Sequence, residues 1–587
     1  MKTINYIMFF IAGIFLFVSC DKYLDKTPEA DVTDNDIFGN YVSFQGVEDV
    51  MYKYIVDYNS ETLISTCNLG PDVNRAAGGA TSAYNSAYGL YWKVIYYSDS
   101  QGNFKFGEGD DYRGLGIWAG SWRGIRVANL ALKNLPLLKD ATEEEKDLIA
   151  GQAYFFRAWF HWEIIKSFGG MPYVDTLFAA DAELNLPRLT FQQTVERIVE
   201  DFDRAASLLP EDWDKTVTGG THVGANTGRA TKGAALAFKA KALLYAGSPL
   251  MNAYSGGAYE FNKSYMERSA VAAWEVIKLA DKGLYALIPF SNYRDMFTKN
   301  DGTWPWTTET IFQKVKSEVG QQQFANRHGR VFSPSRFGGN ANQETVNQIF
   351  VDRFEMADGT RYKPEYDNDN SKRWDFRDPR FRQNIIVDRD KWGLAAATVF
   401  QLYVGGRDKG ASIGMYGPYV VKKFWPLGVN TFDKDWTNYR WVTPHMRLAD
   451  VYLIYAEAVN EAYGADGKAP DANLTAVDAV NKIRERAGMP VVTSAATGYT
   501  SFRELVQNER SVELCFEGNY WFDLRRWYLS HLDENKQSVD LEFDKDWKTF
   551  KRAPIMTRVF DNPKHYWLPI YRDQTQLYKE FYQNPGW

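Results

Sequence analysis

Residues 145–170 read EKDLIAGQAYFFRAWFHWEIIKSFGG and carry two apolar stripes. The first stripe runs from Ile149 to Ile164 in steps of three and four residues, and the second consists of three aromatic residues between Phe155 and Trp162. Steps of three and four residues are the spacing of an α-helix. Because a helix with two apolar stripes must bury both of them, this helix is predicted to lie between two neighbours.

Helical spacing recurs on both sides of this stretch. Thr190 is a predicted N-cap and Pro210 a predicted stop of the next helix. Small residues are frequent along the downstream stretches, where they let partner helices approach closely. The pattern resembles tetratricopeptide-type helix pairs, although no strict period of about 34 residues is kept. The other predicted helices cover residues 44–69, 189–210, 228–249, 268–283, 446–464, 474–490 and 500–518.

Residues 290–440 differ in composition from these helical stretches. They are rich in Gly, Asn, Asp and aromatic residues and contain few helix-length patterns. We predict long loops and short strands laid over one face of a helical scaffold, so the fold class is mainly α. A Gly-rich loop is also expected from Gly70 to about Ser82. Loops held on a rigid scaffold are frequent sites of binding.

The first twenty residues have the pattern of a secretory signal. Lys2 is followed by an apolar run of about fifteen residues, which is short of the roughly twenty that span a bilayer. Phe17-Val18-Ser19-Cys20 resembles the bacterial lipobox, in which the Cys becomes the lipidated first residue of the mature protein. We therefore predict a signal peptide over residues 1–19, lipidation of Cys20, and a polar tether over residues 20–40. Several acyl chains hold a protein durably on a membrane without a spanning helix.

The composition argues against nucleic-acid binding and against a structural zinc site. The mature chain would have 587 − 19 = 568 residues, and 45% hydrophobic with 24% charged residues is typical of a globular protein. A net charge of −6 provides no electrostatic footprint for nucleic acid. With Cys20 lipidated, only Cys67 and Cys515 remain, which is too few for a structural zinc site. We expect no metal and no cofactor, and a buried thiol at Cys515.

Seven segments together resemble the SusD/RagB family of surface nutrient-binding lipoproteins. They occur in the family's order and span nearly the whole mature chain, which makes the resemblance specific. The segments are the lipobox with YLDKTP behind it, FFRAWFHWEIIKSFGGMPY, GRATKGAALAFKAKALLY, MRLADVYLIYAEAVN, VNKIRERAGMP, NERSVELCFEGNYWFDLRRW and WLPIYRDQTQLYKEFYQNPGW.

The resemblance implies a helical fold, a place on the outer membrane facing the exterior, and a SusC-like TonB-dependent transporter as partner. It divides the chain into an N-terminal helical region (41–290) and a C-terminal region (291–587), packed as one body, with loops over 291–440 and helices over 441–530. The implied ligand is an oligosaccharide, although some members handle peptides. Most charged motif residues are expected to be structural: Arg157, Arg484, Arg486, Glu509, Arg510, Glu513, Asp523, Arg525 and Arg526.

Catalysis is not expected. Residues 410–414 match G-x-S-x-G, but Gly417 and Pro418 follow, so the helix that a hydrolase needs after its serine does not begin there. A glycoside hydrolase needs two carboxylates at a defined separation. Sequence alone does not exclude such a pair, so a helical-barrel glycosidase stays as the less favoured alternative.

Sugar binding needs exposed rings for the flat C–H face of a sugar and polar groups for its hydroxyls. Two or three stacked rings with several hydrogen bonds would supply roughly 4–6 kcal/mol, or a Kd from about 1 mM to tens of micromolar. Two stretches fit, one early in the chain and one around a Trp-Pro-Trp loop. The alternative is that these aromatic residues pack the loops onto the scaffold. The candidate ligand-binding residues are Asp72, Asn74, Arg75, Tyr88, Trp92, Trp304 and Trp306.

Overall fold

The computed structural model describes residues 33–56, 69–75, 82–92, 117–179, 181–183, 185–315, 320–321, 324, 332–339, 344–409, 417–577 and 579–587. The predicted signal peptide, Cys20, most of the predicted tether, Cys67 and the G-x-S-x-G stretch lie outside these residues. Within the described part of the chain, no helix combines the length and the apolar character needed to cross a bilayer.

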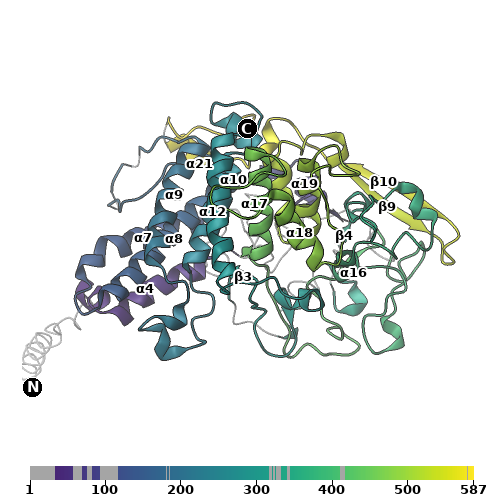
Figure 1. The fold of residues 1–587 in the computed structure, drawn as a ribbon, viewed down its shortest axis with the longest axis horizontal. Helices are drawn as coiled ribbons and strands as arrows, with labels where there is room; N and C mark the ends of the chain where they lie inside the picture. Colours follow the sequence, from purple (N-terminus) through teal and green to yellow (C-terminus); the bar gives the residue numbers. More distant parts are fainter. Residues whose placement is uncertain are drawn as a thin grey trace, which may run out of the picture.

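The helices form an array in which each packs on the next (Figure 1). Contacts lead from α4 through α7, α8, α9, α10 and α12 to α17, which also contacts α18 and α19. The mainly helical prediction is confirmed. The helices are α4 (Tyr41–Tyr54), α7 (Ile117–Asn134), α8 (Glu143–Phe168), α9 (Phe191–Leu208), α10 (Lys232–Ala246), α12 (Lys263–Asp281), α17 (Leu448–Tyr463), α18 (Ala476–Arg486) and α19 (Phe502–Glu513), with the shorter α3 (Asp34–Phe38), α5 (Ser82–Ala87), α11 (Pro249–Tyr254), α15 (Gln348–Val351), α16 (Pro379–Asn384), α20 (Tyr520–Arg526) and α21 (Arg572–Leu577).

Helix α8 is the central member, as its two apolar stripes predict. It lies between α7 and α9, and all the residues of both stripes are buried. Thr142 and Glu145 form a capping box at its start. The three consecutive glutamates of the first turn interact favourably with the positive end of the helix dipole. Gly169 ends the helix with a positive φ of 82°. Helix α9 likewise begins at a capping box, formed by Thr190 with Gln193.

The N-terminal elements differ from the expected tether and helix. Residues Asp34–Phe38 form helix α3, which begins with a capping box at Thr33 and buries Phe38 against Phe44, their ring centroids 5.0 Å apart. Helix α3 therefore lies within the range assigned to the tether. Helix α4 ends at Tyr54, well before the predicted end at residue 69, and the β-branched pair Ile55-Val56 follows it outside the helix.

The stretch between residues 290 and 440 contains loops and short strands, as predicted, but it also has a hydrophobic core of its own. Phe297, Phe337 and Trp425 are among its fully buried residues. The strands pair as antiparallel two-stranded sheets, β1 with β4, β2 with β7, β3 with β8, β5 with β6 and β9 with β10. They are β1 (Val73–Arg75), β2 (Thr298–Lys299), β3 (Thr310–Phe312), β4 (Glu344–Val346), β5 (Ile385–Ile386), β6 (Val420–Val421), β7 (Arg440–Trp441), β8 (Met446–Arg447), β9 (Gln537–Phe543) and β10 (Phe550–Thr557).

A buried network of ion pairs joins the helices to the loop-rich stretch. At its centre Arg447, just before α17, donates to Glu309 and Glu513 at 2.8 Å and to both carboxylate oxygens of Glu517. Arg486 at the end of α18 pairs with the same Glu309 and Glu513. Separating buried paired charges costs much free energy. The network therefore fixes how the loop-rich stretch packs on helices α17, α18 and α19.

The charged motif residues are structural, as expected. Arg157 makes a bidentate pair with Asp201, with nitrogen–oxygen distances of 2.6 and 2.8 Å. Arg525 donates to the backbone of residues 565 and 566 and lies 3.5 Å from the centre of the Trp521 ring. The others are buried in ion pairs that link α16, α17, α18, α19 and α20: Arg484, Glu509, Arg510, Asp523 and Arg526. Cys515 is a buried free thiol, as predicted, and burial raises its pKa to about 12.

Glu48 on α4 is an exception to this pairing of buried charges. Its side chain is fully buried, and neither carboxylate oxygen has a hydrogen-bond partner within the described residues. Burial raises the pKa of Glu48 well above its ordinary value, Asp49 raises it further, and Arg229 lowers it. The folded protein therefore favours the neutral acid at this position.

We expect Glu48→Gln to stabilise the fold by about 1–3 kcal/mol near neutral pH. Below the unfolded pKa of about 4.3, Glu48 is neutral in both states, so the penalty for ionisation is absent. As the pH rises past that value, the unfolded chain ionises while the folded chain resists, so the cost of Glu48 grows. Melting temperatures measured across this range should therefore separate as the pH rises. Parallel curves for the two proteins would contradict this.

Candidate functional site

The early segment that carries five of the candidate residues is held by the C-terminal half of the chain. Strand β1 pairs with β4, and Val73 lies opposite Val346. Beside them, the Asn347 amide donates to the carbonyl oxygens of Pro71 and Gln537 at 2.8 Å and accepts from the Val539 backbone at 3.0 Å. One buried side chain thus ties β1 to β9.

Asp72 and Asn74 are buried in this junction. The Asn74 amide donates to the carbonyl of Val539 at 3.1 Å. Burial raises the pKa of Asp72 to about 7, against a smaller opposing effect of the nearby Arg558 guanidinium. Both side chains are only 2% exposed, so neither is placed to contact a ligand at the surface. Arg75 is placed by its backbone, opposite Glu344 in the β1–β4 pair.

Tyr88 and Trp92, in contrast, are exposed. Their relative exposures are 43% and 47%, whereas most Phe, Trp and Tyr side chains among the described residues are buried. Both flank a turn after α5 at Gly89, whose φ is +68° and whose Cα lies so close to His565 that a Cβ would come within 2.6 Å of that ring. The turn is further held by the hydrogen bond from the Val559 amide to the Ala87 carbonyl, 2.8 Å.

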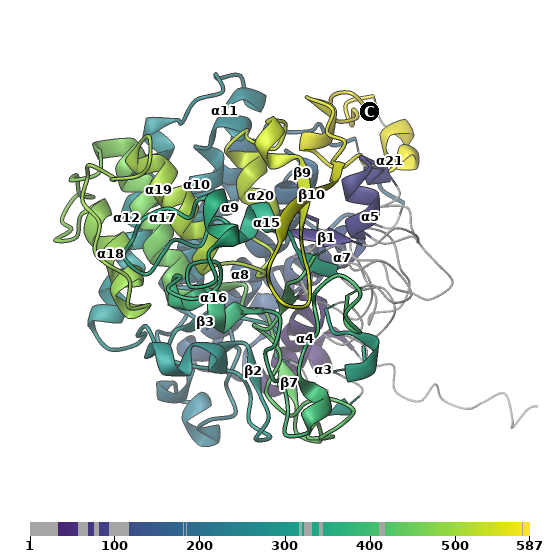
Figure 2. The same ribbon diagram turned by 90° about the vertical axis from the view of Figure 1, so that its right-hand side faces the viewer.

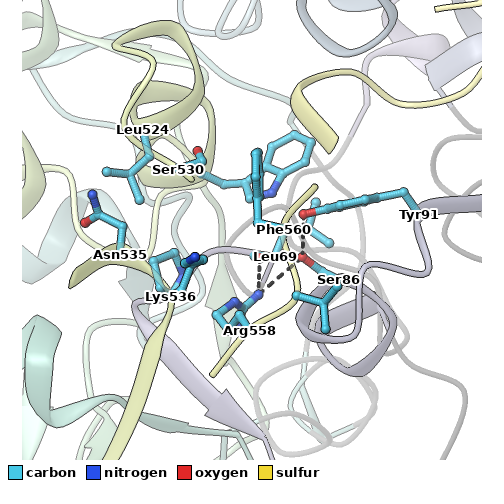
Figure 3. A pocket seen from close by; sticks show the side chains of 12 residues that line it. Leu69, Ser86, Tyr91, Leu524, Ser530, Asn535, Lys536, Arg558 and Phe560 are labelled. Atoms are coloured by element: carbon cyan, nitrogen blue, oxygen red, sulfur yellow. Dashed lines mark hydrogen bonds between the residues drawn. The ribbon is translucent and has the colours of Figure 1, made fainter. Parts of the chain in front are cut away.

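A small cavity lies behind this turn (Figure 3). Arg558 enters it and donates to the Leu69 carbonyl at 2.6 Å and to the Ser86 hydroxyl at 3.2 Å. The volume of about 30 Å³ fits a single water molecule and not a sugar ring. The residues that line the cavity therefore hold the turn on its protein side. A sugar at this place would have to bind on the solvent side, on the exposed rings of Tyr88 and Trp92.

Trp304 and Trp306 are half-buried in the segment between β2 and β3. The Arg440 guanidinium lies 4.2 Å from the centre of the Trp304 ring, so that ring already has a cation beside it. Pro305 between them is buried, and its carbonyl accepts from the Gln313 amide at 2.9 Å. The loop is thus fastened at its middle, with part of both rings still open to solvent.

The structure does not bring the two groups of aromatic residues together. Figure 2 places α5, which precedes Tyr88, well apart from strands β2 and β7, which hold the Trp304 loop. They are two separate candidate surfaces. Over the described ranges, no group of three or more His, Cys, Asp or Glu residues is arranged to hold a metal ion.

Two family models match the chain, one after the other. Residues 22–244 match the SusD-like family described as starch-binding and associating with the outer membrane, and residues 308–587 match the SusD family. The chain belongs to the SusD/RagB family. Members of this family are non-catalytic binding proteins, and the model that matches residues 22–244 describes starch binding and association with the outer membrane.

The similarity to other SusD-like proteins covers most of the length of the chain. SusD-like protein P2 of Formosa agariphila is 24% identical over 446 residues, which cover 73% of the chain and 74% of that protein. A SusD-like protein from Bacteroides fragilis has a TM-score of 0.70 at 22% identity, covering 95% of the chain and 99% of that structure. A SusD-like carbohydrate binding protein from the same species has a TM-score of 0.66 at 19% identity, with coverages of 93% and 99%. These likenesses confirm the SusD-like fold.

The sequence carries no local signal for the residues that hold β1 and the Tyr88–Trp92 turn in place. Asn347, Ser86 and Arg558 are far apart in the chain and form no local motif. The charged motif of residues 509–526 could be recognised in the sequence because its residues lie close together, on the consecutive helices α19 and α20. No comparable spacing marks a contact between residues 86 and 558.

Proposed function

We propose that this SusD-family protein captures an oligosaccharide at the cell exterior and passes it to a SusC-like TonB-dependent transporter, while lipid on Cys20 holds it at the outer membrane. The observation that carries the ligand proposal is the exposure of Tyr88 and Trp92 on a turn that is fixed from behind. Mass spectrometry of the protein extracted from membranes tests the anchor, and an unmodified Cys20 would overturn it.

The chemistry of the rings suits a sugar. Aromatic faces pack against the C–H face of a pyranose, and a turn that is already rigid loses little conformational entropy when a ligand binds. An affinity between about 1 mM and tens of micromolar would allow release to a transporter. A glycan panel and a peptide panel test the ligand class with the purified soluble form. Binding to peptides alone would overturn the oligosaccharide proposal, and release of shorter glycans would overturn binding without cleavage.

Replacing both Tyr88 and Trp92 with Ala should raise the Kd for the glycan about tenfold or more, because two stacking rings at about 0.5–1.5 kcal/mol each are lost. Isothermal titration calorimetry measures this. The matched control removes two exposed rings elsewhere, Tyr463 and Phe376, which are 36% and 70% exposed. Equal losses in both double variants, or no loss in the first, would contradict the assignment.

Replacing Trp304 and Trp306 together with Ala should also weaken glycan binding, here with a moderate loss of stability. The contact of Trp304 with Arg440 and the half-burial of both rings make the stability loss about 1–2 kcal/mol. Calorimetry gives both numbers. Unchanged binding with a large drop in melting temperature would assign both rings to the core.

A further inference from the structure

A second, larger cavity opens beside α7, on the side of the molecule where Figure 2 shows α7 and α21. Its volume is about 330 Å³, within the range of small-molecule sites. Trp118 and Ile125 of α7 form its floor together with Phe581, and Trp122 stands half-buried at its side. The segment that follows α8 closes it with Val174, Leu177 and Phe178.

The buried polar side chain of this cavity, that of Asn129, is already engaged in hydrogen bonds. The Asn129 amide donates to the carbonyls of Val174 and Thr176 at 3.0 and 3.2 Å and accepts from Arg157 at 3.0 Å. A sugar in this cavity would lose its hydrogen bonds to water and regain few of them. The remaining lining is mostly aliphatic and aromatic, so it favours an apolar guest.

One charge stands at the mouth of the cavity. Among the described residues that line it, Arg126 is the only charged one, and its side chain is exposed. Its guanidinium reaches the Phe178 carbonyl at 3.5 Å, a long contact that leaves most of its donors to other acceptors. The neighbouring Asp175 carboxylate is paired with Arg197 at 2.7 Å. The mouth therefore suits an anionic group.

The volume sets the size of the guest. An apolar cavity of about 150 Å³ holds benzene, so 330 Å³ accommodates an apolar body about twice that size. We propose that this cavity binds a small amphiphile, with an apolar body of that size among Trp118, Ile125 and Leu177 and an anionic head group on Arg126. None of the exposed rings proposed to bind the oligosaccharide lines this cavity.

The test uses decanoate and decanol as probes, below their micelle-forming concentrations, with titration calorimetry on the soluble protein. Decanoate should bind saturably. Leu177→Trp fills the cavity and should weaken binding of both probes at least tenfold. Ala179→Trp fills it from an exposed position and serves if Leu177→Trp does not fold.

The head-group contact has its own matched control. Arg126→Gln should weaken decanoate at least threefold and leave decanol unchanged, whereas Arg123→Gln, an exposed arginine one turn away on α7, should change neither. No saturable binding of decanoate to the unchanged protein, or binding that survives both filling variants, overturns the proposal. So does displacement of decanoate by a glycan, since that would make the cavity a sugar site.

Discussion

Arg447→Ala is expected to lower the free energy of unfolding by about 3–5 kcal/mol. The change leaves three buried carboxylates, Glu309, Glu513 and Glu517, without their shared guanidinium. Arg486 and Lys423 each stay beside part of this group, but neither reaches all three acids. Chemical denaturation followed by circular dichroism measures the effect.

The control for Arg447 is an ion pair of the same chemistry at the surface. Arg361 and Glu504 lie 2.6 Å apart, and their side chains are 42% and 35% exposed to solvent, in contrast to the fully buried network around Arg447. Arg361→Ala should cost less than about 1 kcal/mol, because water replaces the lost partner. Equal costs at the two positions would show that the buried network does not carry the stability assigned to it.

Asn347→Leu is expected to lower the free energy of unfolding by about 3 kcal/mol and to weaken glycan binding as well. The substitution removes partners from the Pro71 and Gln537 carbonyls and the Val539 amide, each worth about 1–1.5 kcal/mol when buried. It also removes the N-cap of α15, since the Asn347 side chain accepts from the Ile349 amide. Helix α5, which precedes Tyr88, contacts β1, so loosening β1 should also loosen the Tyr88–Trp92 turn.

The structure offers a matched asparagine. Asn384 is also fully buried, but its amide nitrogen and oxygen have no hydrogen-bond partner within the described residues. Asn384→Leu should therefore be close to neutral or stabilising. A cost at residue 384 equal to the cost at 347 would mean that the loss follows from side-chain shape and not from hydrogen bonds.

The sequence by itself determined the helical array and the family. The two stripes of α8 require two neighbours because apolar surface on both sides must be covered, and α7 and α9 provide them. The capping signal at Thr190 marked a helix start because its hydrogen bond reaches only three residues along the chain. Information that acts over one or two helical turns can be read locally.

Only the tertiary structure decided which polar and aromatic candidates stay accessible. Asp72 and Trp92 come from one segment of similar composition, yet Asp72 is buried, with its carbonyl accepting from the Asn347 backbone, and Trp92 is exposed. The difference arises from contacts with residues 347, 539 and 558, hundreds of positions away in the chain. The burial of a side chain depends on which distant segments pack against it, and the local composition does not determine those contacts.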